Sequence, residues 1–127
     1  MADVRTVGKR LVELCKAGKN LQAIDELYSP NIVSLEAHGD SQMPARMEGT
    51  KAIKGKNEWW FSNHTIHSAD ASGPWFNGDR FVVYFKMDIT SGAGPMVGQR
   101  MEIEEAGVYT VKDGKIVQEE FFYDMGG

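Results

Sequence analysis

The chain has 127 residues, of which 42% are hydrophobic and 25% charged, and this composition excludes a disordered chain or a small disulfide-built scaffold. The length suits one domain over residues 1–127, because two separate cores would each bury too little apolar surface. The net charge of −4 and the lack of a long basic run argue against a nucleic-acid partner.

The single cysteine and the short apolar runs predict the compartment. Cys15 has no second cysteine with which to form a disulfide inside the chain, so we expect a buried thiol and a reducing compartment. The longest apolar run, residues 81–85, is too short to span a membrane, and residues 1–10 contain no apolar leader segment. We therefore expect a cytoplasmic protein with no membrane partner.

Two short helices are predicted at the start of the chain. Apolar side chains recur at helical spacing over residues 4–15, with Asp3 as the expected N-cap and Gly18 as a left-handed residue after the helix. A second apolar face covers residues 21–28, with Asn20 as its expected N-cap. Both helices should pack their apolar faces against the rest of the domain.

A strand and a third helix follow. Residues 31–37 are rich in β-branched side chains and alternate loosely, which predicts a strand that leaves into a polar loop. Thr50 is expected to cap a helix that runs to Asn63 and is weakened by Gly55.

The remainder of the chain predicts β structure. Turn signals at Asn77-Gly78, residues 92–95 and Asp113-Gly114 separate strands over residues 66–75, 79–91, 97–111 and 115–124. Gly98 and Gly107 are expected where this long sheet bends. Three helices against one curved, mostly antiparallel sheet make an α+β fold.

Three segments carry a family resemblance: Glu26 to Glu36, Met47 to Ile53, and Val108 to Ile116. Their order and spacing resemble the SnoaL-like, ketosteroid-isomerase-like branch of the nuclear transport factor 2 superfamily. The resemblance implies a cone-shaped α+β roll, with the three helices packed in the concave face of the sheet around a pocket. Relatives of this kind catalyse different reactions or none, so the fold by itself does not assign an activity.

The resemblance also implies a site. In ketosteroid isomerase a first-strand carboxylate, eight residues after the tyrosine that ends the helix, moves a proton beside a carbonyl; counted from Tyr28, that position is Glu36. A half-buried carboxylate suits this chemistry because burial raises its pKa. The alternative for Glu36 is a solvated glutamate at a strand end.

The isomerase's two oxyanion donors fall near Leu11 and Gly107 in this chain, and neither residue can donate through its side chain. Steroid isomerisation by that mechanism is therefore not expected. Glu105 lies one pleat earlier than Gly107 and is a charge among hydrophobic neighbours, so Glu36 and Glu105 are the two candidate catalytic residues. A structural salt bridge, or a bulge that turns Glu105 outward, is the alternative.

Alternation within the strands indicates which side chains face the pocket. In strand 79–91 the inward set is Phe81, Val83, Phe85, Met87 and Ile89, and in the last strand the family register places Glu119, Phe121 and Tyr123 inward. Trp75 is also expected in an apolar pocket wall, although any single aromatic residue can be ordinary core. The candidate substrate-binding residues are Tyr28, Ser34, His38, Trp59, Trp60, Phe85, Met87, Tyr109, Phe121 and Tyr123.

Metal and cofactor sites are not predicted. His38, His64 and His67 fall on different predicted elements, and no cysteine or carboxylate completes a ligand spacing. No glycine-rich phosphate loop or nucleophile elbow occurs, so we expect no cofactor and no acyl-enzyme.

Three functions stay open. The first is a cofactor-free isomerase, hydratase or cyclase-type enzyme that uses Glu36 as acid and base on a small hydrophobic molecule. The second is a non-catalytic small-molecule-binding domain, and the third is a protein-interaction module that uses the convex sheet. Because relatives often pair through that sheet, we expect a homodimer.

Overall fold

The computed structural model describes residues 2–41 and 43–124, in which two helices, two strands, a third helix and four further strands follow one another along the chain. Their bounds are α1 Val4–Lys16, α2 Asn20–Leu27, β1 Tyr28–Leu35, β2 Arg46–Glu48, α3 Thr50–Asn63, β3 His64–Asn77, β4 Arg80–Ser91, β5 Arg100–Lys112 and β6 Lys115–Phe122.

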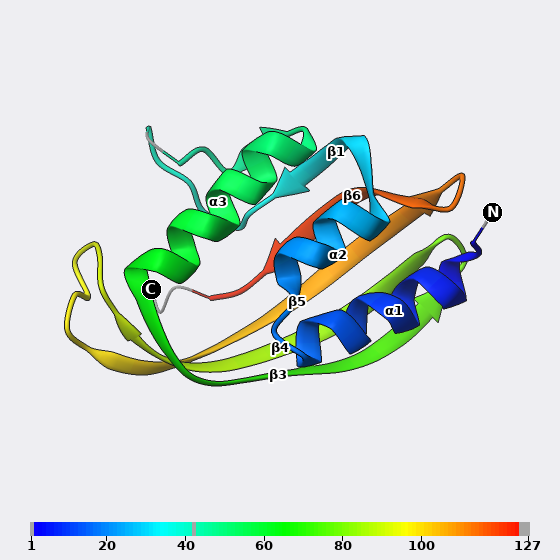
Figure 1. The fold of residues 1–127 in the computed structure, drawn as a ribbon. Coiled ribbons are helices and arrows are strands. Elements are labelled where there is room, and N and C mark those ends of the chain that lie inside the picture. Colours follow the sequence, from blue (N-terminus) through cyan, green and yellow to red (C-terminus); the bar gives the residue numbers. More distant parts are fainter. Residues whose placement is uncertain (1, 42, 125–127) are drawn as a thin grey trace.

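The strands form one curved sheet in the order β2-β1-β6-β5-β4-β3. All neighbouring strands are antiparallel except β1 and β6, which run parallel. The three helices lie on one side of the sheet, with α1 along β3 and β4 and α3 beside β1 and β3 (Figure 1). The α+β class and the packing of the helices in the concave face are therefore confirmed.

The helix ends are partly as predicted. The Asp3 carboxylate accepts a hydrogen bond from the main-chain N–H of Thr6 at 2.8 Å, and Gly18 has φ of 74°. The expected caps Asn20 and Thr50 were wrong, because both lie inside their helices and the residues before them occupy the N-cap positions. Asn20 instead directs its amide toward the Cys15 sulfur, at 3.8 Å.

The predicted strands were shifted at their ends. β1 begins at Tyr28, directly after α2, and ends at Leu35, so Glu36 and Ala37 lie just beyond it. The three residues of β2 were not predicted, since so short a segment shows no alternation. The pairing of β5 runs through Gly107 without a register shift, so there is no bulge at Gly107, and the other expected bend, Gly98, lies before β5 begins.

Gly107 has a packing role instead. A Cβ atom there would lie 2.9 Å from Cε2 of Tyr109 and 3.2 Å from Cε1 of Phe121. The lack of a side chain at Gly107 therefore leaves room for the inward-facing rings of Tyr109 and Phe121.

The core lies between the three helices and the concave face of β1 and β3 to β6. Phe81 of β4 and Tyr109 of β5 face each other across the register and stack with ring centroids 5.1 Å apart. Val83 and Ile89 are buried on the same face of β4, whereas Phe85 and Met87 are partly buried. The predicted inward face of β4 is thus confirmed. Within the described ranges, no helix has the length and apolar character needed to cross a membrane.

Candidate functional site

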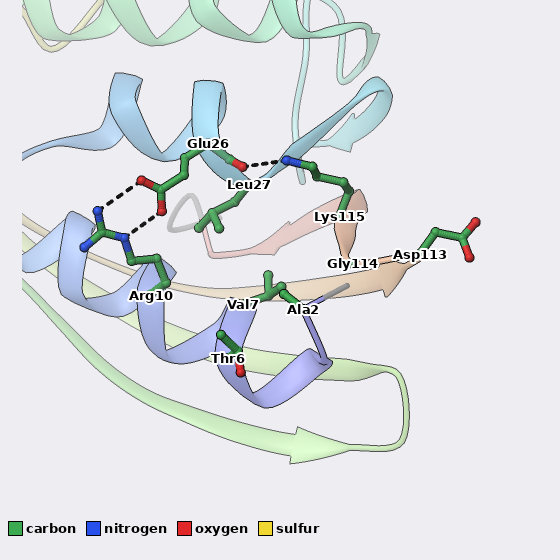
Figure 2. Close-up of a pocket in the computed structure, with 9 residues that line it drawn as sticks. All are labelled: Ala2, Thr6, Val7, Arg10, Glu26, Leu27, Asp113, Gly114 and Lys115. Atoms are coloured by element: carbon green, nitrogen blue, oxygen red, sulfur yellow. Dashed lines mark hydrogen bonds and ion pairs between the residues drawn. The ribbon is translucent and has the colours of Figure 1, made fainter.

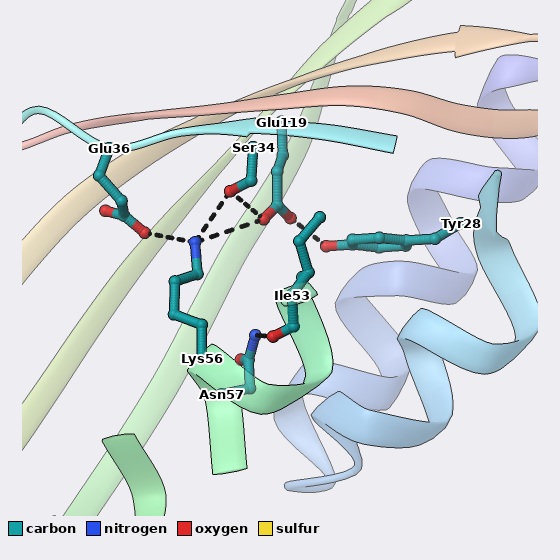
Figure 3. Close-up of polar contacts among 7 residues, drawn as sticks. All are labelled: Tyr28, Ser34, Glu36, Ile53, Lys56, Asn57 and Glu119. Atoms are coloured by element: carbon teal, nitrogen blue, oxygen red, sulfur yellow. Dashed lines mark hydrogen bonds and ion pairs between the residues drawn. The ribbon is translucent and has the colours of Figure 1, made fainter. Parts of the chain in front are cut away.

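A buried carboxylate lies at the centre of the sheet. Glu119 of β6 is only 2% exposed, and the register places it beside Ser34 of β1 on one side and Tyr109 of β5 on the other. The Tyr28 hydroxyl donates a hydrogen bond to one oxygen of Glu119, and the Ser34 hydroxyl donates to the other at 2.7 Å (Figure 3). Burial raises the pKa of Glu119, against the influence of the Lys56 ammonium.

Lys56 brings a positive charge to this carboxylate from the helical layer. Its Nζ donates to Ser34 Oγ and to Glu36 Oε1, at 2.8 Å each, and lies 3.9 Å from Glu119 Oε2. The Lys56 side chain is 12% exposed, and its ammonium lies 5.5 Å from the Phe121 ring centroid. One turn earlier on the same face, Ile53 is fully buried.

Glu36 is part of this network and is not a free solvated glutamate. Its main-chain N–H donates to the carbonyl of Ala45 at 2.8 Å, which fixes the chain just beyond β1. Its carboxylate forms the ion pair with Lys56. The alternative of a solvated strand-end residue is therefore wrong for Glu36.

Glu105 of β5 lies opposite Phe85 of β4 on the inward face. Burial, followed by the negative charge of Glu36, raises the pKa of Glu105 to about 7, while the Lys56 ammonium acts in the opposite direction. Among the residues that the structure describes, none forms a hydrogen bond or ion pair with the Glu105 carboxyl. Neither a structural salt bridge nor an outward bulge accounts for this glutamate.

Tyr123 and His38 lie close to Glu36. Burial, the charge of Glu36 and a hydrogen bond to Glu36 raise the pKa of Tyr123 to about 12. The His38 ring centroid is 6.0 Å from that of Tyr123, and His38 itself is exposed. These two residues therefore connect the loop after β1 with the segment after β6.

The predicted aromatic wall is only partly assembled. Trp60 is partly buried and stacks on His64 with centroids 4.4 Å apart, whereas Trp59 of the same helix is exposed. Trp75 is 58% exposed and pairs with Val82 on the outer side of β4, so its predicted place in the pocket wall was wrong. The neighbouring Phe76 takes the inward position, near Phe81.

Two hollows lie away from the predicted site residues. The first, of about 460 Å³, lies between the start of α1, the end of α2 and the β5–β6 turn. Figure 2 shows Arg10 and Glu26 joined there by an ion pair, at 2.6 and 3.0 Å, and Lys115 donating to the Glu26 carbonyl. The second, of about 480 Å³, is lined by polar residues of α2 and α3, among them Asp25 and Lys54. Neither is lined by any residue predicted for the site.

The sequence interpretation missed two residues of the network, Lys56 and Glu119. Glu119 was placed on the inward face but was not recognised as a site residue, although a charge on that face needs a partner. Lys56 follows the buried Ile53 by three residues, so helical spacing could have placed it inward. Across residues 2–41 and 43–124, no three His, Cys, Asp or Glu side chains are grouped so as to hold a metal ion.

The sequence profile described as the SnoaL-like domain matches residues 3–123. The chain is 37% identical to a candidate SnoaL-like polyketide cyclase from Mesorhizobium loti, with 96% of this chain and 100% of that one covered and a TM-score of 0.88.

Two more distant structures share the fold. A candidate isomerase from Bacillus subtilis is 18% identical, with 95% and 86% of the two chains covered and a TM-score of 0.71. A protein from Catenulispora acidiphila with a ketosteroid isomerase-like fold, solved in complex with trimethylamine, is 13% identical, with 94% and 85% of the two chains covered and a TM-score of 0.69. A search of curated proteins returned no significant match. On its profile match and its likeness to the Mesorhizobium loti protein, the chain belongs to the SnoaL-like family.

Proposed function

We propose that this protein is a cofactor-free acid–base catalyst that moves a proton on a small hydrophobic carbonyl compound, as an isomerase, hydratase or cyclase would. The observation that carries the proposal is the Glu105 carboxyl, which is influenced by the charged pair Glu36–Lys56 and has a pKa of about 7. A general acid and base works best when its pKa is close to the working pH. Such a group is half protonated near neutrality and can both take and return a proton.

The two glutamates have different roles in this proposal. Glu36 is held by Lys56 and raises the pKa of its neighbour, whereas Glu105 has no hydrogen-bond partner among the described residues and is available to a ligand. The family resemblance implied proton transfer by Glu36, but the ion pair favours Glu105 for that step. The partly buried Phe85, Met87, Trp60 and Phe121, with Tyr123 near Glu36, would contact the ligand. The likeness to a candidate polyketide cyclase supports a carbonyl-rich substrate.

The test is deuterium exchange at a carbon beside a carbonyl. β-Tetralone, a flat apolar ketone, is incubated with the protein in D₂O, and NMR follows the loss of its α-proton signals. We expect the wild type to exceed the buffer rate and Glu105→Gln to lower the protein-dependent rate by roughly 10²- to 10⁴-fold, the usual contribution of a positioned base.

A matched control is available at the adjacent position. Glu104 is exposed on the opposite face of β5, so Glu104→Gln should leave the exchange rate unchanged. A wild-type rate no greater than the buffer rate, or equal rates for wild type and Glu105→Gln, would remove the basis for catalysis.

Non-catalytic binding is the second candidate function. It is supported by the two family donor positions, where Leu11 and Gly107 are buried and offer no side-chain donor. A relative of the same fold was solved with trimethylamine bound, which is a ligand and not evidence of a reaction in that protein. Saturable binding of β-tetralone without any protein-dependent exchange would favour this function over catalysis.

We also propose that the chain forms a homodimer through the convex face of the sheet. Trp75 and Phe122 are 58% and 51% exposed there, and the register places four less exposed apolar residues between them. These are Val82, Tyr84, Ala106 and Val108. A contiguous apolar face of this kind is typical of an interface.

Sedimentation equilibrium checks the dimer. Trp75→Glu with Phe122→Lys should weaken self-association by roughly 30-fold or more, as expected for buried aromatic anchors. Met96→Gln is the control, because Met96 is exposed on the loop between β4 and β5 and not on the convex sheet. A wild-type monomer would contradict the dimer and leave this face to a different protein, as in an interaction module.

A further inference from the structure

We propose that Lys56 is a further catalytic residue, whose ammonium donates a hydrogen bond to the ligand oxygen on which negative charge develops. The proposal rests on the proposed function, because it assigns the electrophilic partner of the base. It also gives this chain an oxyanion donor from a different position, because Leu11 and Gly107 have no side chain that can donate. The donor comes from α3, an element on which the sequence interpretation placed no charged site residue.

The geometry leaves one N–H of Lys56 available. An ammonium has three N–H donors, and two are used at 2.8 Å by Ser34 and Glu36. The next acceptor, Glu119 Oε2, is 3.9 Å away and too distant for a hydrogen bond. Among the described residues there is no third acceptor within range. A ligand oxygen near Glu105 could therefore accept the third bond.

The ammonium is also held in place before any ligand arrives. Ser34 accepts from Lys56 and donates to Glu119, which in turn accepts from the Tyr28 hydroxyl (Figure 3). The chain of contacts thus links α3 to β1 and β6. A donor fixed in a largely buried site stabilises developing charge without reorganisation, which is the main source of oxyanion stabilisation in enzymes.

The same contacts argue against Lys56 as a nucleophile. A lysine that attacks a carbonyl must lose its proton, and active sites favour that loss by apolar surroundings or a second cation. Here Glu36 and Glu119 both lie within 4 Å of Nζ and favour the charged ammonium. Lys56 is suited to stabilise an anion and not to form an imine.

The proposed step conserves atoms and electrons. The Glu105 carboxylate takes the α-proton, and the C–H electron pair forms the new C=C bond while the carbonyl π pair moves to oxygen. Lys56 donates to the resulting enolate oxygen. Glu105 then returns its proton, or a deuteron in D₂O, to carbon, so no oxidant or further reactant is required.

Binding of para-nitrophenol tests this role without any turnover. The phenolate resembles an enolate, and its absorbance reports how much of the bound compound is ionised. The measurement uses Glu105→Gln, whose neutral amide stands in for the protonated base, with and without Lys56→Met. If Lys56 donates to the ligand oxygen, the pKa of bound para-nitrophenol should be lower by about one unit or more when Lys56 is present, a tenfold change in ionisation.

Chemical rescue controls for misfolding. The thiol introduced by Lys56→Cys is alkylated with bromoethylamine, which restores an ammonium at nearly the same distance. Burial raises the pKa of Cys15 to about 12, so the native thiol should not react. When Lys56→Cys is combined with Glu105→Gln, alkylation should restore the low pKa of bound para-nitrophenol. When Glu105 is kept, Lys56→Cys should lower the rate of β-tetralone exchange by roughly 10²- to 10³-fold, and alkylation should restore that rate.

The outcomes separate the two proposals. In one outcome, Glu105→Gln loses exchange but removal of Lys56 leaves the pKa of bound para-nitrophenol unchanged. This outcome would overturn the role of Lys56 and leave the proposed catalysis by Glu105 in place. Failure of para-nitrophenol to bind would overturn it as well. In another outcome, the wild type shows no exchange but Lys56 lowers the pKa of bound para-nitrophenol as expected. This outcome would contradict the proposed catalysis and leave Lys56 as a ligand-binding donor.

Discussion

Glu105→Gln is expected to stabilise the protein at alkaline pH by about 3 kcal/mol and to leave its stability nearly unchanged at acidic pH. The pKa of Glu105 is raised from 4.5 to about 7, mainly by burial, so the fold favours the protonated carboxyl. That stabilising contribution is complete below the unfolded value and is lost as the pH rises through the folded value. The amide of the variant remains neutral at every pH. The free energy of unfolding of the variant should therefore rise relative to that of the wild type between about pH 5 and pH 8.

Urea unfolding at a series of pH values measures this difference as a change in midpoint at constant slope. Glu104→Gln is the matched control, because the exposed Glu104 side chain should change stability by no more than about 0.5 kcal/mol at any pH. A pH-independent difference between wild type and Glu105→Gln would contradict a raised pKa at this position. A residue that costs stability at working pH is more easily explained by function than by folding.

Phe81→Ala is expected to lower the free energy of unfolding by about 3–5 kcal/mol, the usual cost of removing a buried ring. Phe81 is 1% exposed and stacks on Tyr109, and Gly8 of α1 approaches it so closely that an added Cβ would lie 3.3 Å from Cγ. Helix, ring and sheet are therefore in contact, and the surrounding residues cannot readily collapse into the space.

Phe122→Ala removes the same atoms from a side chain that is 51% exposed, and its cost should be below about 1 kcal/mol. Unfolding at several protein concentrations separates any contribution from self-association, since only that contribution varies with concentration. Equal losses for the two variants would show that Phe81 is not part of a tightly packed core.

Local patterns predicted much of the fold. Helical spacing located α1, and Asp3 was recognisable as its cap because a short acidic side chain before an apolar repeat accepts the free N–H groups. Alternation located β4 and its buried face, including Phe81 and Val83. Each of these features depends on residues within one element, so the sequence shows them directly.

The network around Glu119 could not be predicted in the same way. Its hydrogen bond with Ser34 joins residues 85 positions apart, and that contact depends on the parallel pairing of β1 with β6. Lys56 reaches the same place from a helix whose register against the sheet is set by side-chain packing. Family resemblance directed attention to Glu36 but gave no reason to expect its ion pair with Lys56. Tertiary contacts decide such sites, and local propensity does not record them.

The position of β6 between β1 and β5 also sets an order of events for a chain that grows from its N-terminus. The strands β3, β4 and β5 follow one another and can pair by local hairpins, whereas β1 must wait for residues 115–122 before its parallel neighbour exists. Strands so far apart in the sequence pair slowly. Until they pair, an unpaired edge of the sheet is exposed to strands of other chains. Because Ser34 and Glu119 face each other across this junction, the candidate site is assembled only when the sheet is completed.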